Sequence, residues 1–246
     1  MKPVEETGRR LLPDAVADRI REAILDGEFA PGDRLPPERE LAEQLHVNRS
    51  SIREALKKLE QLRLVEIQQG SGIRVRAVED ASFDLVWDLV ARSGTRDRSW
   101  MLGLLELREA LFPGIVRIAM NRSSPSELRK TSGKVHEFMQ RAYSDAEFID
   151  LLRTLQGDLA ELTGNPVLKL FSNALQRGID ATPVARWLGP ERRKITPLVL
   201  RVAVAVEAGD IDTAERTTRD ITRRVNEAVI EGMNREASAH PHTDGS

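Results

Sequence analysis

The sequence predicts a mainly α-helical protein with two domains, of which only the first contains β-structure. Apolar residues recur three and four positions apart over most of the 246 residues. Two short extended runs are joined by a glycine-containing turn at residues 69–72, and strand signals are absent beyond Val78. We place the domains at residues 10–77 and 78–235, with a disordered tail at residues 236–246.

The first domain begins with a helix in which apolar residues recur at helical spacing from Leu12 to Ile24. The turn DGEFAPGD ends this helix, and a short strand is expected at Arg34 and Leu35. The second helix lies in PPERELAEQL, where proline favours the first turn and the acidic residues favour the positive end of the helix dipole. The turn HVN then separates it from a third helix.

The third helix is predicted to run from Arg49 to Leu62, because the preceding Asn48 can cap free backbone amides. A helical wheel separates its two faces. Its packed face holds Ile52, Ala55, Leu59 and Leu62, and its opposite face holds Ser50, Arg53, Lys57 and Gln61. Two strands follow, at Leu64 to Gln68 and Ile73 to Arg76, and the glycines between them can adopt positive φ.

Helix, turn, arginine-bearing helix and glycine-tipped hairpin together indicate a winged helix-turn-helix, a module that reads DNA. The segments LPPERELAEQLHVNRSSIREALKKLE and IQQGSGIRV closely resemble this module in the GntR family of bacterial transcription regulators. The later segments LLELREALFPGIVRIA, ELTGNPVL and AVEAGDIDTAERTTRDI resemble the all-helical effector-binding domain of the FadR subfamily. The resemblance therefore implies a winged helix-turn-helix followed by an all-α bundle.

The resemblance also implies which residues touch double-stranded DNA. They are Arg39, Asn48, Arg49, Ser50, Arg53, Gln69 and Gly70. Arginine can bind a guanine edge through two hydrogen bonds, while a serine at a helix N-terminus suits a phosphate. Gln69 stands where some members have histidine, and Pro37 stands where serine often caps the second helix, so one capping bond is expected to be lost.

The second domain is predicted to consist only of helices. Their expected ranges are about 81–92, 99–121, 125–142, 145–163, 166–177, 181–188, 190–208 and 211–233. Many members of the family that this domain resembles bind a divalent metal in the effector-binding domain, through one aspartate and three histidines. The corresponding positions in this chain are Leu152, Gln156, Val199 and Ile221, which supply neither carboxylate nor imidazole. We therefore expect no metal.

Arg108 is the most informative residue of this domain, because it falls within an apolar stripe that must face the bundle interior. A buried guanidinium needs an anionic partner. In the family this position lines the effector cavity and meets an acidic group of the ligand. The alternatives are an internal pair with Asp158 or Glu161, or a side chain that extends to solvent.

Three further residues are candidates for effector binding, namely Gln156, Thr218 and Thr222, although each could simply be half-exposed. An apolar cavity with one arginine and few polar groups suits a long acyl chain. We therefore expect a metal-independent regulator whose operator binding is weakened by a fatty acid or long-chain acyl-CoA. The alternatives are a small carboxylate or a sugar acid as effector, or a helical adaptor that does not bind DNA.

Composition narrows the remaining classes. There is no cysteine, and no segment has the form of a signal peptide or the roughly 20 apolar residues of a membrane helix, so a cytoplasmic protein without membrane contact is expected. No catalytic motif is recognisable, so we do not expect an enzyme. Because one recognition helix covers few bases, we expect a homodimer on a short palindromic operator. Phe83 and Trp87 are either part of its interface or ordinary core.

Overall fold

The computed structural model describes residues 12–68, 70–92, 98–178 and 181–239. The chain divides into two compact units, residues 1–89 and residues 90–246. Residues 78–89, which the sequence analysis assigned to the helical domain, therefore group with the first unit.

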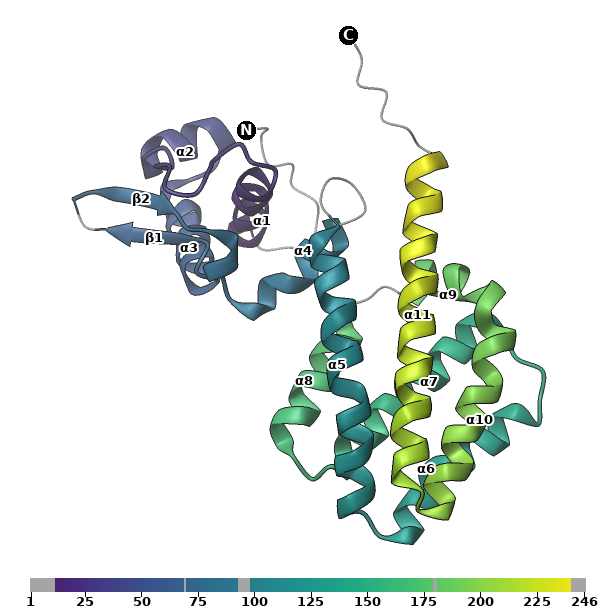
Figure 1. Ribbon diagram of the computed structural model, residues 1–246. Coiled ribbons are helices and arrows are strands. Elements are labelled where there is room, and N and C mark those ends of the chain that lie inside the picture. The colour runs from purple at the N-terminus through teal and green to yellow at the C-terminus, as the bar shows by residue number, and fades with distance from the viewer. Residues whose placement is uncertain (1–11, 69, 93–97, 179–180, 240–246) are drawn as a thin grey trace. The chain divides into compact units, whose positions relative to one another are not determined.

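The first unit is a winged helix-turn-helix, as predicted (Figure 1). Its elements are α1 (Leu12–Leu25), α2 (Glu38–Leu45), α3 (Arg49–Gln61), β1 (Val65–Gln68) and β2 (Gly72–Val75). Helix α3 packs against both α1 and α2. The core of the unit contains Val16, Ile20, Leu41, Leu45, Ile52, Leu56 and Leu59, each at most 1% exposed. This apolar layer holds the opposite face of α3 outward.

Helix α3 begins where the sequence predicts. The Asn48 side chain accepts a hydrogen bond of 2.8 Å from the Ser51 amide, which satisfies one of the free donors of the first turn. Pro37 precedes α2 and makes no side-chain capping bond, so the expected loss of that bond is confirmed. His46 adopts a left-handed conformation, with φ of 56°, and so turns the chain from α2 toward α3.

The wing is an antiparallel hairpin in which Val65 pairs with Val75. Gly70 and Gly72 have φ values of 78° and 89°, a region that side chains with a Cβ rarely adopt. The predicted short strand before α2 exists as a bridge from Arg34 to Arg74 on the outer side of β2. The wing thus consists of β1, β2 and the extended residue Arg34, which pairs with β2.

The helix predicted at residues 81–92 is wrong in its first half. The structure has two 3₁₀ turns, η1 (Val78–Asp80) and η2 (Phe83–Leu85), before α4 (Val86–Arg92). Ala81 and Ser82 are extended between the two turns, and the Ser82 hydroxyl accepts a hydrogen bond from the Asp84 amide, so helical structure begins only at Phe83. Phe83 is 46% exposed and contacts the edge of Trp87.

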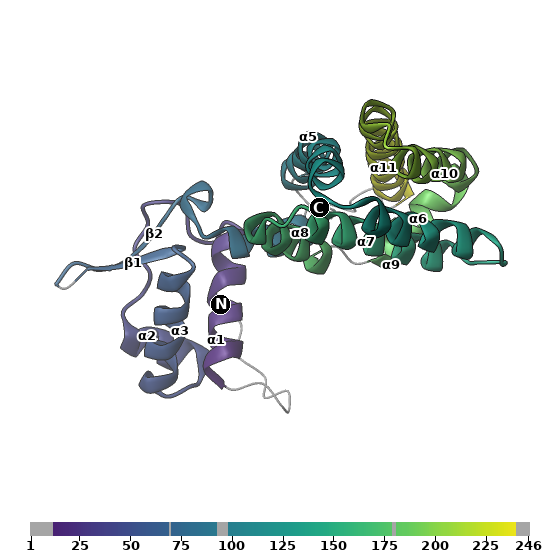
Figure 2. The ribbon, with the colours of Figure 1, turned by 90° about the horizontal axis from the view of Figure 1, so that it is seen from below.

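The second unit is all-helical, as predicted. Its helices are α5 (Ser99–Arg122), α6 (Pro125–Met139), α7 (Asp145–Leu162), α8 (Pro166–Gly178), α9 (Ala181–Leu188), α10 (Arg192–Ala208) and α11 (Ile211–Ala239), with a 3₁₀ turn η3 (Gly189–Glu191) before α10. Helices α5, α10 and α11 form one layer, and α6 to α9 form the other (Figure 2). None of the helices in the described ranges is long and apolar enough to span a bilayer.

Helix boundaries differ from prediction mainly at the ends. Helix α6 stops at Met139, and α11 continues to Ala239, past the predicted end at residue 233 and into the predicted tail, of which residues 240–246 lie outside the described ranges. Both α6 and α7 start with a capping box. In α7, hydrogen bonds from the Ser144 amide, Arg141 and the Ser144 hydroxyl lower the pKa of Glu147 to about 2.

Helix α9 is held against α11 by a close contact between Trp187 and Gly232. A Cβ added at Gly232 would lie 2.1 Å from Cγ of Trp187, far inside van der Waals contact. The indole Nε1 also donates a 3.0 Å hydrogen bond to Glu236, which keeps the ring in place. Only glycine therefore permits this approach of the two helices.

We expect Gly232→Ala to lower the free energy of unfolding by about 1–3 kcal/mol, because the ring or the helix must shift. Chemical denaturation measures this loss. Gly103→Ala in α5 is the matched control, since nothing lies within 4 Å of its added Cβ. There the better helix propensity of alanine should stabilise the protein by about 0.5–1 kcal/mol. Equal effects of the two changes would show that the Trp187 contact does not constrain the fold.

Candidate DNA-binding surface and effector cavity

The candidate DNA-binding surface lies on the outward face of α3, where Arg49, Ser50 and Arg53 are exposed. Arg49 and Ser50 occupy the first turn, so their side chains lie beside the free amides of the helix N-terminus. Across residues 12–68 and 70–92, Arg49 forms no ion pair with another side chain. Its guanidinium is therefore available to a partner outside the protein.

The other predicted DNA contacts are arranged less simply. Arg53 donates a 2.8 Å hydrogen bond to Glu38 at the start of α2, so its guanidinium is already oriented by a carboxylate. Arg39 is 78% exposed and lies 3.8 Å from Glu43, a weak surface pair. Asn48 uses its side-chain oxygen as the helix cap, which leaves only its amide nitrogen for DNA.

The wing contributes one described residue of the predicted set. Gly70 is exposed at its tip, and the Ser71 amide closes the turn onto the Gln68 carbonyl at 3.1 Å. Gln69 lies outside the described residues. Sequence reasoning missed the partnership of Arg53 with Glu38, because the two residues are 15 positions apart and no local pattern joins them.

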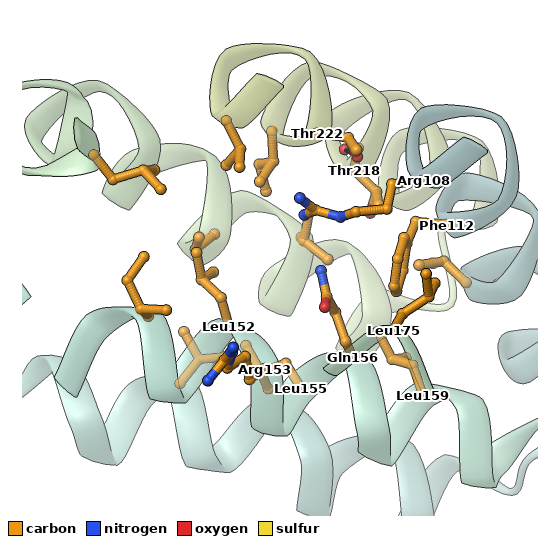
Figure 3. Close-up of a pocket in the computed structure, with 18 of the residues that line it drawn as sticks. Arg108, Phe112, Leu152, Arg153, Leu155, Gln156, Leu159, Leu175, Thr218 and Thr222 are labelled. Carbon is orange, nitrogen blue, oxygen red and sulfur yellow. Dashed lines mark hydrogen bonds between the residues drawn. The ribbon is translucent and has the colours of Figure 1, made fainter. Parts of the chain in front are cut away.

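The second unit encloses a cavity of about 150 Å³ between its two helical layers. Most of its lining is aliphatic and comes from α5, α6, α7, α10 and α11, with Leu175 of α8 and with Val184 and Leu188 of α9. Figure 3 shows Arg108 reaching from α5 into the space between α11 and α7, and Gln156 pointing toward it from α7. The cavity thus combines an apolar wall with a small polar region.

The four positions that the family resemblance aligns with metal ligands come together in this cavity. Leu152 and Gln156 of α7, Val199 of α10 and Ile221 of α11 all line it. Three of these side chains are aliphatic and the fourth is an amide, a donor set that does not fit a divalent cation. These four side chains therefore give the cavity apolar and amide groups at positions where a metal would need carboxylate or imidazole.

Arg108 lines the cavity with its charge poorly solvated. Burial, aided by the charge of Arg153, lowers the pKa of the Arg108 guanidinium to about 10, so the group still remains charged at neutral pH. Its guanidinium carbon lies 5.8 Å from the ring centroid of Phe112. Among the described residues, no carboxylate forms an ion pair with Arg108.

The internal partners considered for Arg108 are engaged elsewhere. Asp158 accepts a 2.6 Å hydrogen bond from Lys134, and Glu161 lies 3.3 Å from Lys169. The alternative of an internal pair with either acid is therefore wrong. The positive charge of Arg108 faces a cavity instead.

The structure brings the other predicted effector residues to the same cavity but restricts what they can do. Gln156, Thr218 and Thr222 all line it. The Thr218 hydroxyl donates to the Ala214 carbonyl at 2.8 Å, and the Thr222 hydroxyl donates to the Thr218 carbonyl at 2.7 Å. Both hydroxyls therefore offer a ligand only acceptor lone pairs, which leaves Gln156 as the flexible polar partner.

Sequence reasoning missed Arg153, a second guanidinium that lines the cavity. Helical spacing could have predicted it, because residues three apart on a helix share a face. Arg153 precedes Gln156 by three residues, just as Leu152 precedes Leu155, and all four line the cavity. It also missed Ser132 of α6, whose hydroxyl lines the cavity and donates a 2.8 Å hydrogen bond to Glu207.

Comparison with known proteins agrees with both units. The sequence model for bacterial regulatory proteins of the gntR family matches residues 12–75, and the model for the FCD domain matches residues 103–224. The HTH-type transcriptional regulator Mce2R of Mycobacterium tuberculosis is 31% identical over 239 residues, covering 94% of this chain and 96% of that protein. The chain belongs to the GntR family. It is a DNA-binding transcriptional regulator with an FCD effector domain, and not an enzyme.

Two further relatives match over shorter segments, and one solved structure matches over most of the chain. An uncharacterized HTH-type transcriptional regulator of M. tuberculosis is 44% identical over 119 residues, about 48% of each chain. The fatty acid metabolism regulator protein of Salmonella paratyphi B is 30% identical over 177 residues, or 69% of this chain and 72% of that protein. A solved structure of Lar, which controls the agr system of Listeria monocytogenes, has a TM-score of 0.56 at 17% identity and covers 92% of this chain and 99% of its own. This last likeness concerns the fold.

Proposed function

We propose that this GntR regulator acts in the cytoplasm as a homodimer that leaves a short palindromic operator when a fatty acid or fatty acyl-CoA enters the cavity of its FCD domain. The observation that carries the proposal is the lining of that cavity, which is apolar except for a charged arginine, a second arginine, a few hydroxyl groups and the amide of Gln156. Such a lining matches a ligand with an apolar chain and an anionic head. The relation to a fatty acid metabolism regulator supports the same class, and with it the FadR subfamily.

The size of the cavity determines how such a ligand would act. A volume of about 150 Å³ is below the range of about 300–1,000 Å³ that is typical of ligand pockets. A long acyl chain exceeds this volume, so we expect the α6 to α9 layer to move away from α5, α10 and α11 when such a chain binds. This separation is the displacement that would change the spacing of the two DNA-binding units in the dimer.

The same volume favours one alternative ligand, a short apolar carboxylate that fits without any movement of the helical layers. A sugar acid suits the cavity less well, because its hydroxyl groups need many partners while the Thr218 and Thr222 hydroxyl protons are already engaged. In both favoured cases the donor set at the former metal position implies that binding needs no metal.

A series of saturated fatty acids from butanoate to hexadecanoate, with hexadecanoyl-CoA and gluconate, tests these alternatives. Fluorescence anisotropy of the promoter fragment reports release of DNA, with metal-free and Zn²⁺-containing buffers in parallel. If a long chain is the effector, each added CH₂ should raise the affinity roughly three- to fourfold, from about 0.8 kcal/mol of burial. An optimum at short chains would select the small carboxylate. Release by gluconate alone, or only with Zn²⁺, would refute the proposal.

A further inference from the structure

The cavity of the second unit has a further polar region on α6, formed by the hydroxyls of Thr131 and Ser132. Both residues line the cavity, and they are 9% and 2% exposed. Hydroxyl groups at this depth normally have a hydrogen-bond partner, because burying an unpaired hydroxyl is unfavourable. The bonds that this hydroxyl pair makes within the protein therefore determine what it can offer to a ligand.

Thr131 differs from four other threonines of the second unit. The other four hydroxyls each donate to the carbonyl four residues earlier at 2.7–2.9 Å, and they belong to Thr154, Thr196, Thr218 and Thr222. Within residues 98–178 and 181–239, the hydroxyl of Thr131 has no hydrogen-bond partner. It can therefore both donate a hydrogen bond to a ligand in the cavity and accept one from it.

Ser132 is restricted by Glu207 of α10. Its hydroxyl oxygen lies 2.8 Å from Oε1 of Glu207 and 3.2 Å from the carbonyl of Arg129. Nε2 of His136 lies 3.2 Å from the same oxygen of Glu207 and helps to hold the carboxylate. Because a hydroxyl has one proton and a carboxylate is the stronger acceptor, the proton is directed to Glu207. Ser132 therefore offers a ligand only its lone pairs.

The hydroxyl pair lies where the chain of an acyl ligand would pass. Leu128, one turn earlier on α6, packs in one apolar cluster with Val116 of α5. Arg108 precedes Val116 on α5 by about 12 Å of helix. A ligand whose carboxylate contacts Arg108 therefore reaches the hydroxyl pair with its chain and not with its head group.

One donor and neighbouring acceptors match a hydroxyl group on such a chain. The oxygen of an alcohol can accept the Thr131 proton while its own proton is donated to Ser132. A ketone can only accept, and a CH₂ group can do neither. An unsubstituted chain would leave the Thr131 hydroxyl buried and unpaired.

We propose that the hydroxyl pair is a subsite for a hydroxyl group carried on the effector chain, so that the effector is a hydroxylated fatty acid or its CoA thioester. Arg108 then receives the head group, and the hydroxyl pair selects among chains of equal length. This inference rests on the proposed function, because it assumes an apolar acid in the cavity.

The test compares the fatty acid of the best chain length with its hydroxylated forms, using calorimetric titration of the full-length protein. The series carries one hydroxyl group at each carbon of the chain in turn, together with the ketone that corresponds to the best isomer. One hydroxy acid should bind about tenfold or more tightly than the parent acid, because it completes two hydrogen bonds in a buried site. The ketone should gain less, because it cannot donate to Ser132.

Thr131→Val removes the hydroxyl and keeps the branched shape of the side chain. The preference for the hydroxy acid should fall to about threefold or less, while binding of the parent acid stays equal or becomes slightly tighter. Ser132→Ala should also reduce the preference. Thr154→Val is the matched control, because the exposed Thr154 already donates its proton to the Asp150 carbonyl.

The ratio of the two affinities separates a binding role from a structural one, since a general loss of fold lowers both together. If the parent acid binds and no hydroxylated form binds more tightly, this inference fails and the proposed function stands. A full preference in Thr131→Val would also refute the subsite. If no fatty acid of any length binds, both proposals fail. If Thr131→Val does not fold, the ratio in Thr131→Ser, which keeps the hydroxyl, is compared with that in Thr131→Ala, and equal ratios refute the subsite.

Discussion

Arg108→Met is expected to stabilise the effector-free protein while it removes the response to the effector. In the free protein the guanidinium carries its charge beside Arg153 with no carboxylate partner among the described residues, and burial lowers its pKa to about 10. Because this pKa lies below the usual value for arginine, the destabilisation is fully present below about pH 10, and therefore at neutral pH. Methionine is unbranched and flexible, so it can fill the same space without a charge.

We expect the free energy of unfolding of Arg108→Met to rise by about 1–3 kcal/mol, as happens when poorly compensated buried charges are replaced by apolar side chains. Carboxylate affinity should fall 100-fold or more, because an anion would then enter an apolar site with one guanidinium fewer. Denaturant titration at pH 7 and operator release in the presence of the effector measure the two quantities. Arg117→Met is the control, since Arg117 is paired with Asp212 and Glu215 at the surface.

The combination of gained stability and lost response is the distinctive result, because residues that bind ligands commonly carry a cost in stability. A variant that is destabilised by more than about 1 kcal/mol would contradict the unpaired state of Arg108 and would indicate a structural anionic partner. A variant that still releases DNA with unchanged sensitivity would remove Arg108 from the effector site.

Arg49→Ala is expected to weaken operator binding about 100-fold or more in the proposed dimer. Arg49 lies in the first turn of α3, exposed and with no ion pair to the described residues, at the position from which a recognition helix contacts base edges. One good contact of an arginine with a guanine contributes about 1–3 kcal/mol of discrimination, and a twofold symmetric complex contains it twice. The slope of log affinity against log salt should also become shallower if Arg49 contacts phosphate instead.

Comparison with Arg53→Ala sharpens this prediction. Arg53 is bound to Glu38 in the free protein, so part of its contact with DNA replaces an existing hydrogen bond. Its loss should therefore cost less than the loss of Arg49. Anisotropy titrations of operator and scrambled DNA at several salt concentrations measure both effects, with Arg193→Ala in the second unit as control. Equal affinity of the wild type and Arg49→Ala for the operator would show that α3 is not the recognition helix.

Local rules explain why the elements of both units could be predicted. The spacing of apolar residues, the cap at Asn48 and the glycines at residues 70 and 72 each act through neighbours in the chain, so their effects can be recognised without a structure. The difference at residues 81–82 has the same local origin, because Ser82 is extended and its hydroxyl caps the helical turn that begins at Phe83. The continuation of α11 to Ala239 had a local signal too, in the helix formers Arg235, Glu236 and Ala237 and in the i,i+4 pair of Glu231 with Arg235.

The sequence by itself determined that this protein reads DNA with a winged helix-turn-helix and carries an all-helical effector domain with an arginine on its inner face. Only the tertiary structure decided which groups meet in the cavity. Arg153 lines the same cavity as Arg108, and the threonine hydroxyls donate to carbonyls of their own helix. In the first unit, Glu38 accepts a hydrogen bond from Arg53. No pattern in the neighbouring sequence indicates which groups these side chains contact. The physical reason is that periodicity specifies which face of a helix is buried, whereas the crossing of two helices decides what that face contacts.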